Sequence, residues 1–257
     1  MNSYQEDAVR LENIGFSYGT GQNGLPRSLY KNFSFSLPIG SIVAVMGTSG
    51  AGKSTFGRLL TKMLKPEQGE ISWSSNFKCT SDMVYIDQQP LNSIFPWQTV
   101  QRNVEYPLQK LKWSKGDTQE RAAYLLSSFR LEHLSETYPR NLSGGELQRL
   151  AVARGVSWRP KLVVLDESFT ALDRRIKNEV LSTLYSLSVK DQMTVLLITH
   201  NLSDVLALAN RCVILGSRPV NIISNLEINL AYPRIEGTPD YMAVQDRLIE
   251  VLKHGLI

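Results

Sequence analysis

The sequence predicts an α/β fold that includes a small antiparallel β subdomain near the N-terminus and a helical insertion. Short, unbroken apolar runs at residues 42–46, 162–165 and 194–198 are typical of parallel strands buried on both faces. Alternating apolar residues before residue 40 favour short antiparallel strands. Residues 98–158 carry mostly helical patterning, which predicts the inserted helical subdomain.

The composition is that of an ordinary globular protein. Of the 257 residues, 42% are hydrophobic and 20% are charged, and the length predicts a single domain over residues 1–257. The net charge of +4 is not gathered into a run of lysines or arginines, which argues against a nucleic-acid partner. No signal segment is evident, and no apolar run approaches the roughly 20 residues that span a bilayer, so we expect a cytoplasmic protein. Cys79 and Cys212 are expected to be reduced and packed.

The expected elements follow in order along the chain. Residues 10–18 and 28–37 predict the antiparallel strands. After the strand at residues 42–46, apolar residues recur at helical spacing over residues 56–64, and Pro66 ends this helix. A last helix is expected to begin at Thr238-Pro239-Asp240, because threonine suits the N-cap and proline suits the first helical position.

A glycine-rich segment joins the strand at residues 42–46 to the following helix. Glycines at such a turn let backbone N–H groups surround phosphate oxygens, and the helix adds its positive N-terminal end. We expect Lys53 to contact the β- and γ-phosphates and the Ser54 hydroxyl to bind Mg²⁺. A chance glycine-rich turn is the alternative, expected in about one in a hundred chains of this length. The segment comprises Gly47, Thr48, Ser49, Gly50, Ala51, Gly52, Lys53, Ser54 and Thr55.

Two acidic residues end the apolar run at residues 162–165. Asp166 and Glu167 could be solvated charges at a strand end, but the phosphate-binding segment favours a catalytic interpretation. Asp166 is then expected to hold the hydration shell of Mg²⁺, and Glu167 to orient or deprotonate the attacking water. His200 follows the run at residues 194–198 and is expected to approach the same nucleotide.

A second glycine-containing turn precedes an expected helix at Leu142-Ser143-Gly144-Gly145-Glu146. Ser143 alone would be explained as an N-cap, with Glu146 favourable in the first helical turn. The pair Gly144 and Gly145 is not explained by capping, and it leaves backbone N–H groups open to an anion. This is a second phosphate site, and one subunit cannot easily direct both sites at one γ-phosphate. The motif therefore predicts a second subunit.

On these motifs the chain resembles the nucleotide-binding subunit of ABC transporters over nearly its whole length, which implies a P-loop ABC-type ATPase core. Residues 47–55 match the Walker A loop, residues 142–149 the signature motif and residues 162–167 the Walker B strand. Further matches are Gln88 to the Q-loop glutamine, Asp173 in residues 170–173 to the D-loop, His200 to the switch histidine and Tyr18 to the aromatic residue that stacks on adenine.

The resemblance implies a mechanism. Two subunits, identical or paralogous, would bind head to tail with two ATP molecules and Mg²⁺ between them. Nucleotide would contact Tyr18, the Walker A loop, Ser143 to Glu146 and Asp173. The metal would be bound by Ser54, Gln88 and Asp166. The residues that act in catalysis would be Glu167, His200 and Gln88. Hydrolysis would reopen the pair, as in other nucleotide-driven switches.

The segment after Gln88 resembles importers for nitrate, sulfonates, taurine and similar small solutes, or for pyrimidine precursors of thiamine. The resemblance rests on Phe95-Pro96-Trp97 and on Gly216-Ser217-Arg218-Pro219. It implies permease subunits, an extracytoplasmic solute-binding protein and a peripheral place on the cytoplasmic face of the membrane. Residues 91–97 are expected to face the permease.

Two other interpretations stay open. A soluble ABC-type ATPase acting on DNA or ribosomes generally has a long coiled-coil insertion or two cassettes in one chain. A P-loop kinase or small nucleotidase without a partner would leave residues 142–149 unexplained. Three departures from the family pattern are Gln89 as a second candidate beside Gln88, Ser168 where proline is common, and Asn201 where aspartate is common.

Overall fold

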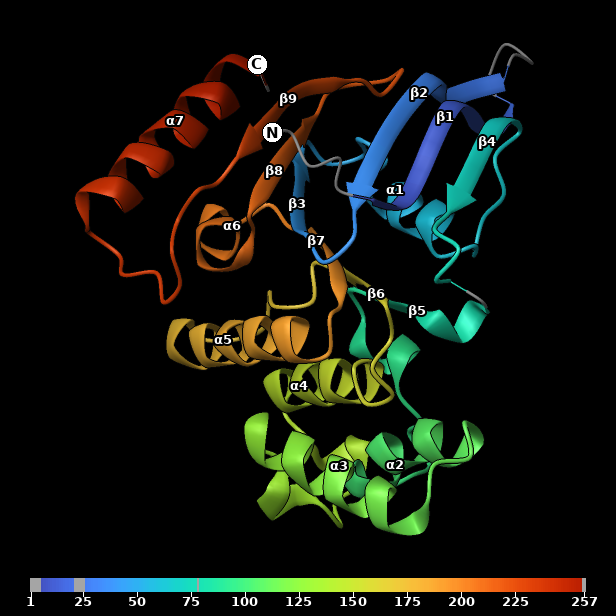
Figure 1. Ribbon diagram of the computed structural model, residues 1–257, viewed down its shortest axis with the longest axis vertical. Coiled ribbons are helices and arrows are strands. Elements are labelled where there is room, and N and C mark those ends of the chain that lie inside the picture. The colour runs from blue at the N-terminus through green and yellow to red at the C-terminus, as the bar shows by residue number, and fades with distance from the viewer. Residues whose placement is uncertain (1–5, 21–25, 78, 256–257) are drawn as a thin grey trace. The chain divides into compact units, whose positions relative to one another are not determined.

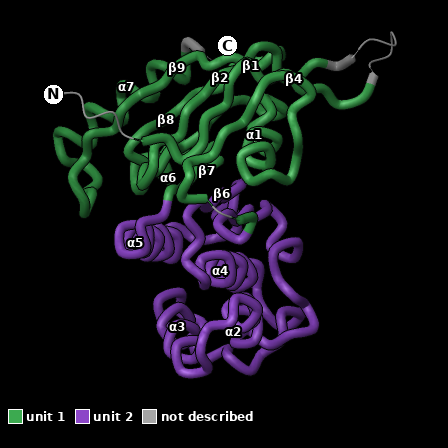
Figure 2. Tube along the Cα trace, turned by 45° about the vertical axis from the view of Figure 1, so that its right-hand side comes forward, with its two compact units in different colours: residues 1–80, 194–257 green, residues 81–193 purple. Residues whose placement is uncertain are grey.

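The computed structural model describes residues 6–20, 26–77 and 79–255. Its contacts divide the chain into two compact units, one formed by residues 1–80 with 194–257 and the other by residues 81–193 (Figure 2). The α/β core, the antiparallel subdomain and the helical insertion that the sequence predicts are all present. The assignment of the whole chain to one domain stays a prediction.

The first unit contains a three-stranded antiparallel sheet in the order β2-β1-β4 (Figure 1). β1 runs over Asp7–Thr20, β2 over Pro26–Pro38 and β4 over Gln68–Trp73. β1 and β2 are longer than the short strands expected, because shifts of register let the paired strands continue past irregular positions. One such shift lies at Asn13, whose backbone is left-handed (φ 53°), a conformation that asparagine tolerates.

A parallel group of strands in the same unit carries the phosphate-binding loop. β7 (Thr194–Ile198), β3 (Ile42–Gly47) and β8 (Arg211–Leu215) lie side by side and parallel, and β9 (Ile222–Glu227) pairs antiparallel with β8. β3 and β7 are confirmed where the sequence predicts them. Their side chains are buried throughout β7 and in β3 up to Met46, as expected for strands covered on both faces.

Three α-helices complete the described part of the first unit: α1 (Lys53–Leu60), α6 (Leu202–Leu208) and α7 (Pro239–Gly255). Phe56 of α1 is fully buried, with its ring 5.0 Å from Phe35 and 5.8 Å from Phe33 between centroids. Burying such a ring contributes about 1.5–3 kcal/mol, so the helix that follows the loop is firmly attached to the antiparallel sheet. α7 begins where the sequence predicts and buries Tyr241 and Leu248 in the core.

The second unit combines a strand pair with four helices. β5 (Met83–Ile86) pairs parallel with β6 (Leu162–Asp166). The α-helices are α2 (Val100–Lys110), α3 (Lys115–Ser128), α4 (Gly144–Gly155) and α5 (Arg174–Lys190). Short 3₁₀ turns occur at Thr80–Asp82, Pro90–Ser93, Glu132–Leu134 and Pro139–Asn141.

Each α-helix of this unit begins at a capping side chain. Thr99, Ser114, Ser143 and Asp173 accept hydrogen bonds from backbone N–H groups of the first turns of α2, α3, α4 and α5. Between residues 98 and 158 the described elements are all helical, as the patterning indicates.

The two cysteines differ in environment. Cys212 is buried in β8, and burial raises the pKa of its thiol to about 12, so this residue is packed as expected. Cys79 is exposed, so the expectation that both thiols are packed is wrong for this residue. No helix in the described part of the chain combines the length and apolar character needed to cross a membrane.

Candidate functional site

The phosphate-binding loop lies between β3 and α1 with its lysine already directed at the loop. Lys53 Nζ donates to the carbonyl oxygens of Gly47 at 2.9 Å and Thr48 at 3.0 Å, and its side chain is almost entirely buried. The loop backbone thus keeps the ammonium beside the position where phosphates are expected. A bound β- or γ-phosphate would compete with these carbonyl groups for the ammonium.

Two tyrosines from the antiparallel sheet contact the C-terminal part of the loop. Tyr30 Oη donates to the Gly52 carbonyl at 2.8 Å, and Gly52 is left-handed (φ 80°). A Cβ on Gly52 would lie 2.9 Å from Tyr30 Oη, so this position requires glycine. Tyr18 Oη lies 3.0 Å from Thr55 Oγ1, with its ring about half exposed. The expected adenine-stacking residue is therefore next to the loop.

Arg218 is a contact of the loop that sequence reasoning did not assign to the site. Its Nε donates to the Gly50 carbonyl oxygen at 3.1 Å, across 168 positions of sequence. This bond holds a carbonyl of the loop, and with it the orientation of the peptide between Gly50 and Ala51. We therefore expect Arg218 to keep the loop ordered before nucleotide binds.

Arg218→Ala is expected to weaken the affinity for MgATP by about five-fold, because one hydrogen bond that orders the loop, worth about 1 kcal/mol, is lost. Titration with a fluorescent ATP analogue measures this affinity. Ser217→Ala, a change at the exposed neighbouring residue, serves as the control. Unchanged affinity in Arg218→Ala would contradict this role.

The strand-end carboxylates lie in the second unit with two partners. Tyr85 Oη donates to Asp166 Oδ2, which fixes a carboxylate that is itself buried. Gln88 Nε2 donates to Glu167 Oε2 at 2.9 Å. Of the two glutamines considered for the Q-loop, Gln88 is thus beside the expected catalytic carboxylate, whereas Gln89 is the residue before the turn at Pro90–Ser93. Tyr85 was not predicted as a site residue.

Glu167 has an unusual backbone. Its φ angle is 47°, a left-handed conformation that costs a residue with a Cβ about 1–3 kcal/mol. Such strain is common where a side chain must be directed at a ligand. Ser168 follows, and its hydroxyl donates to the Ile86 carbonyl at 3.3 Å. The serine at this position therefore links the end of β6 to the end of β5.

The signature turn forms a capping box at the start of α4. The Ser143 hydroxyl accepts from the Glu146 N–H at 3.3 Å, and Glu146 Oε2 accepts from the Ser143 N–H at 2.7 Å and from its hydroxyl at 2.8 Å. These donors hold the pKa of Glu146 below its ordinary value. The carboxylate is therefore ionised at neutral pH, and its hydrogen bonds to Ser143 stabilise the turn.

The signature helix also contacts the D-loop segment. Gln148 is buried, accepts from the Ala171 N–H at 3.1 Å and lies 3.4 Å from Thr170 Oγ1. A Cβ on Gly145 would lie 3.2 Å from Leu172 Cδ2, so this glycine also makes room for the D-loop segment. Asp173 caps α5 through the N–H groups of its first turn. Gln148 is a positioning residue that sequence reasoning did not find.

His200 follows β7 in the first unit and is exposed. The residues around it form a tight turn, in which Thr199 Oγ1 donates to Asp204 Oδ2 at 3.0 Å. Asn201 Oδ1 accepts from the Ser203 N–H at 3.0 Å and so caps α6. Asparagine thus performs the capping that aspartate would perform. The joint approach of His200, Asp166 and Glu167 to one nucleotide stays a prediction.

Comparison with known protein families decides the wider classification. A family model described as ABC transporter matches residues 30–170, which include the phosphate-binding loop, the signature turn and the strand-end carboxylates. The chain belongs to the ABC transporter family. This ABC transporter protein is therefore an ATP-binding and ATP-hydrolysing subunit, as the resemblance implies.

Named relatives of this ABC transporter subunit cover most of its length. It is 37% identical to the nitrate import ATP-binding protein NrtD of Synechocystis sp. over 81% of the chain and 78% of that protein. It is 32% identical to the aliphatic sulfonates import ATP-binding protein SsuB of Bacillus subtilis, over 89% of the chain and 88% of that protein. A solved dimeric structure of the ATP-binding cassette MJ0796 bound to ADP and Pi matches with a TM-score of 0.74 at 26% identity, over 85% of this chain and 98% of that one.

Proposed function

We propose that this subunit hydrolyses ATP to drive the import of a small solute of the nitrate or sulfonate kind. The observation that carries the proposal is the similarity, over about four-fifths of the chain or more, to ATP-binding proteins named for nitrate and aliphatic sulfonate import. A pyrimidine precursor of thiamine is the alternative solute. The chain acts on the nucleotide, and the solute passes through its membrane partners.

Mg²⁺ is the proposed metal. The residues expected to serve it offer the oxygen donors that this ion prefers: the Ser54 hydroxyl, the Asp166 carboxylate and the Gln88 amide oxygen. Since Gln88 Nε2 donates to Glu167, its amide oxygen remains the acceptor end of that side chain. The donor set therefore fits the ion, which would neutralise charge on the β- and γ-phosphates of ATP.

The chain's own residues supply the rest of the chemistry. Lys53 stabilises negative charge on the β- and γ-phosphates, and backbone N–H groups of the loop bind their oxygens. Glu167 orients the attacking water and accepts its proton, while Gln88 holds one oxygen of that carboxylate in place. His200 donates a hydrogen bond to the γ-phosphate. This contact is lost when hydrolysis releases that phosphate.

The active state is a head-to-tail pair of subunits. Ser143 and Gly145 of one subunit bind the γ-phosphate held by the Walker A loop of the other. The ordered capping box supports this, since a preshaped turn loses little conformational entropy when phosphate binds. The similarity to a cassette solved as a dimer with ADP and Pi favours the same arrangement. The second subunit is an identical copy or a paralogue.

A surface of the second unit is suited to a membrane partner. This docking surface comprises Leu91, Phe95, Trp97 and Tyr106, and Trp97 and Leu91 are 68% and 56% exposed. Phe95 packs 5.4 Å from Trp97 and 5.0 Å from Tyr106 between ring centroids. The guanidinium carbon of Arg154 lies 4.3 Å from the centroid of the Phe95 ring. Neighbouring aromatic groups that are exposed or partly exposed favour a protein interface, and we assign this one to the permease on the cytoplasmic face of the membrane.

Reconstitution tests the proposed function. The subunit is purified with permease subunits and an extracytoplasmic solute-binding protein from the same organism and placed in lipid vesicles. Nitrate, short alkanesulfonates and the thiamine-precursor pyrimidine are then compared for their ability to stimulate ATP hydrolysis. Stimulation by nitrate or a sulfonate supports the proposal. Failure to assemble with any permease would instead favour a soluble ATPase.

Trp97→Ala is expected to abolish solute-stimulated hydrolysis in the reconstituted complex, because an aromatic residue at the centre of an interface typically contributes about 2 kcal/mol or more to binding. The basal rate of the isolated subunit should stay within about two-fold of the wild-type rate. Met242→Ala on α7 is the matched control, since Met242 is a similarly exposed apolar residue. A loss of basal hydrolysis in Trp97→Ala would place Trp97 in the fold rather than in the interface.

A further inference from the structure

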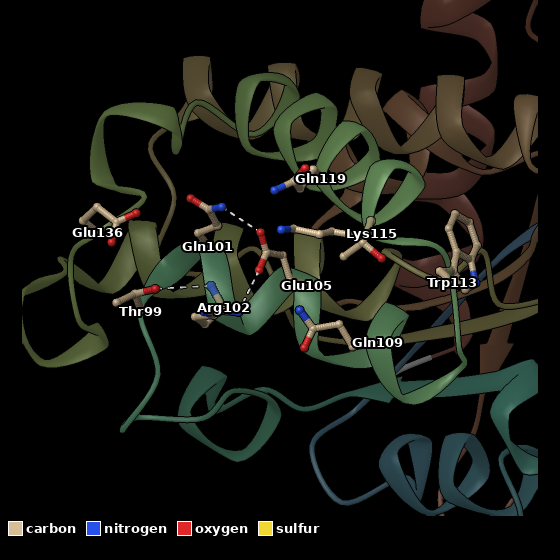
Figure 3. A pocket seen from close by; sticks show the side chains of 10 residues that line it. Thr99, Gln101, Arg102, Glu105, Gln109, Trp113, Lys115, Gln119 and Glu136 are labelled. Carbon is tan, nitrogen blue, oxygen red and sulfur yellow. Dashed lines mark hydrogen bonds and ion pairs between the residues drawn. The ribbon is translucent and has the colours of Figure 1, made fainter.

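A cavity of about 550 Å³ lies between α2 and α3 in the second unit. Figure 3 shows Lys115 and Gln119 of α3 directed toward Gln101 and Glu105 of α2, with Trp113 at one end. The volume falls within the roughly 300–1,000 Å³ of small-molecule sites. The lining residues lie between positions 99 and 136, a range that contains none of the residues expected to bind ATP.

Two buried polar side chains of the cavity, Glu105 and Thr118, can form more hydrogen bonds than they do. Glu105 is 5% exposed, and accepts from Gln101 Nε2 at 2.7 Å and, weakly, from Arg102 Nη1 at 3.4 Å. A carboxylate can accept about four hydrogen bonds. Thr118 is 2% exposed, and its Oγ1 has no hydrogen-bond partner among the described residues. Such groups are costly to bury unless something in the cavity bonds to them.

The cavity is lined by charged residues of both signs: Arg102, Glu105, Lys115 and Glu136. Glu105 is buried, whereas Lys115 lies on the exposed rim. Glu105 forms an ion pair with Arg102 at 3.4 Å, but none of the ion pairs among the described residues joins Glu105 to Lys115. A molecule with an ammonium group at its inner end and a carboxylate at its outer end would complement both. Gln119 adds an amide that can donate or accept, and Trp113 offers an apolar wall to a side chain.

We propose that this cavity binds a free α-amino acid. The ammonium group donates to Glu105 and Thr118, and the carboxylate accepts from Lys115 and Gln119. Ordered water can also form hydrogen bonds with Glu105 and Thr118, but a neutral water molecule forms no ion pair with Lys115 at the rim. α2 carries Glu105 and also Tyr106 of the docking surface, so an occupied cavity stiffens the helix that supports the permease contact.

The first test is direct binding to the full chain. The twenty proteinogenic L-amino acids, each at 10 mM, are screened for a rise in melting temperature, and any hit is titrated by calorimetry. Sodium acetate and methylammonium chloride, which carry one charged end each, are the control probes. Saturable binding of an amino acid, without binding of either control, is expected. Absence of binding by all twenty overturns the proposal and leaves a water-filled cavity.

Variants then locate the bound molecule. Glu105→Gln, Thr118→Val and Lys115→Met are each expected to weaken amino-acid affinity by about ten-fold or more. Lys112→Met changes an exposed lysine between α2 and α3 that does not line the cavity. This variant should leave the amino-acid affinity unchanged. Basal ATP hydrolysis should stay intact in all four and reports folding. If Glu105→Gln does not fold, the other two cavity variants decide, and unchanged affinity in both would refute the site.

Discussion

Glu167→Gln is expected to lower the rate of ATP hydrolysis by a factor of about 10² to 10⁴, the usual contribution of a general base, while ATP still binds. The amide has the shape of the carboxylate and keeps an oxygen to which Gln88 can donate, so the geometry of the end of β6 is retained. It does not accept the proton of the attacking water. The ATP-bound pair of subunits therefore accumulates.

Light scattering coupled to size-exclusion chromatography measures this accumulation in excess MgATP. Glu179→Gln is the control, because Glu179 lies on α5 and pairs with Arg130 at 2.8 Å instead of facing a strand end. The control should hydrolyse ATP normally and remain mostly monomeric. A Glu167→Gln variant that binds ATP and stays monomeric at high protein concentration would refute the head-to-tail pair.

Lys53→Ala should weaken ATP affinity by about 10- to 100-fold, which corresponds to the roughly 1.5–3 kcal/mol of a hydrogen bond to a charged group. The lysine is buried against the Gly47 and Thr48 carbonyls, so its ammonium needs little rearrangement to reach a phosphate. Hydrolysis should fall with affinity, because the same charge stabilises the transferring phosphoryl group.

Calorimetric titration with MgATP measures the effect of Lys53→Ala. Lys53→Met retains most of the side-chain volume and separates loss of charge from loss of packing. Lys62→Ala is the control, since the Lys62 ammonium lies 4.2 Å from the Trp73 ring and is outside the loop. Wild-type affinity in both Lys53 variants would contradict the assignment of the phosphate-binding loop.

The buried parallel strands β3, β6 and β7 could be predicted from the sequence because their whole environment is apolar, whereas β8, which is also parallel and buried from Cys212 to Leu215, was not predicted. β3 and β7 match the apolar runs at residues 42–46 and 194–198 almost to the residue. β4 (Gln68–Trp73) was not predicted, because only Ile71 of its residues is buried. An edge strand with so little apolar surface has no periodic pattern, and pairing with β1 alone decides its conformation.

The residues of the site could be predicted where they belong to one short sequence motif. Loops that surround phosphate need glycines and a lysine at fixed spacing, so residues 47–55 are visible in the sequence. Arg218, Tyr85 and Gln148 escaped prediction, because each acts through a partner far along the chain and belongs to no local pattern. The bond from Arg218 to Gly50 exists only once β8 lies beside β3.

The capping box at Ser143 has a consequence for anion selectivity. Glu146 places a permanent negative charge at the amino end of α4, where free phosphate or sulfate would otherwise be attracted. We therefore expect this carboxylate to repel inorganic anions from a solitary subunit. In the proposed pair of subunits, the lysine and metal of the neighbouring subunit would compensate this repulsion for a bound triphosphate. Physiological phosphate should accordingly be a poor competitor of subunit pairing.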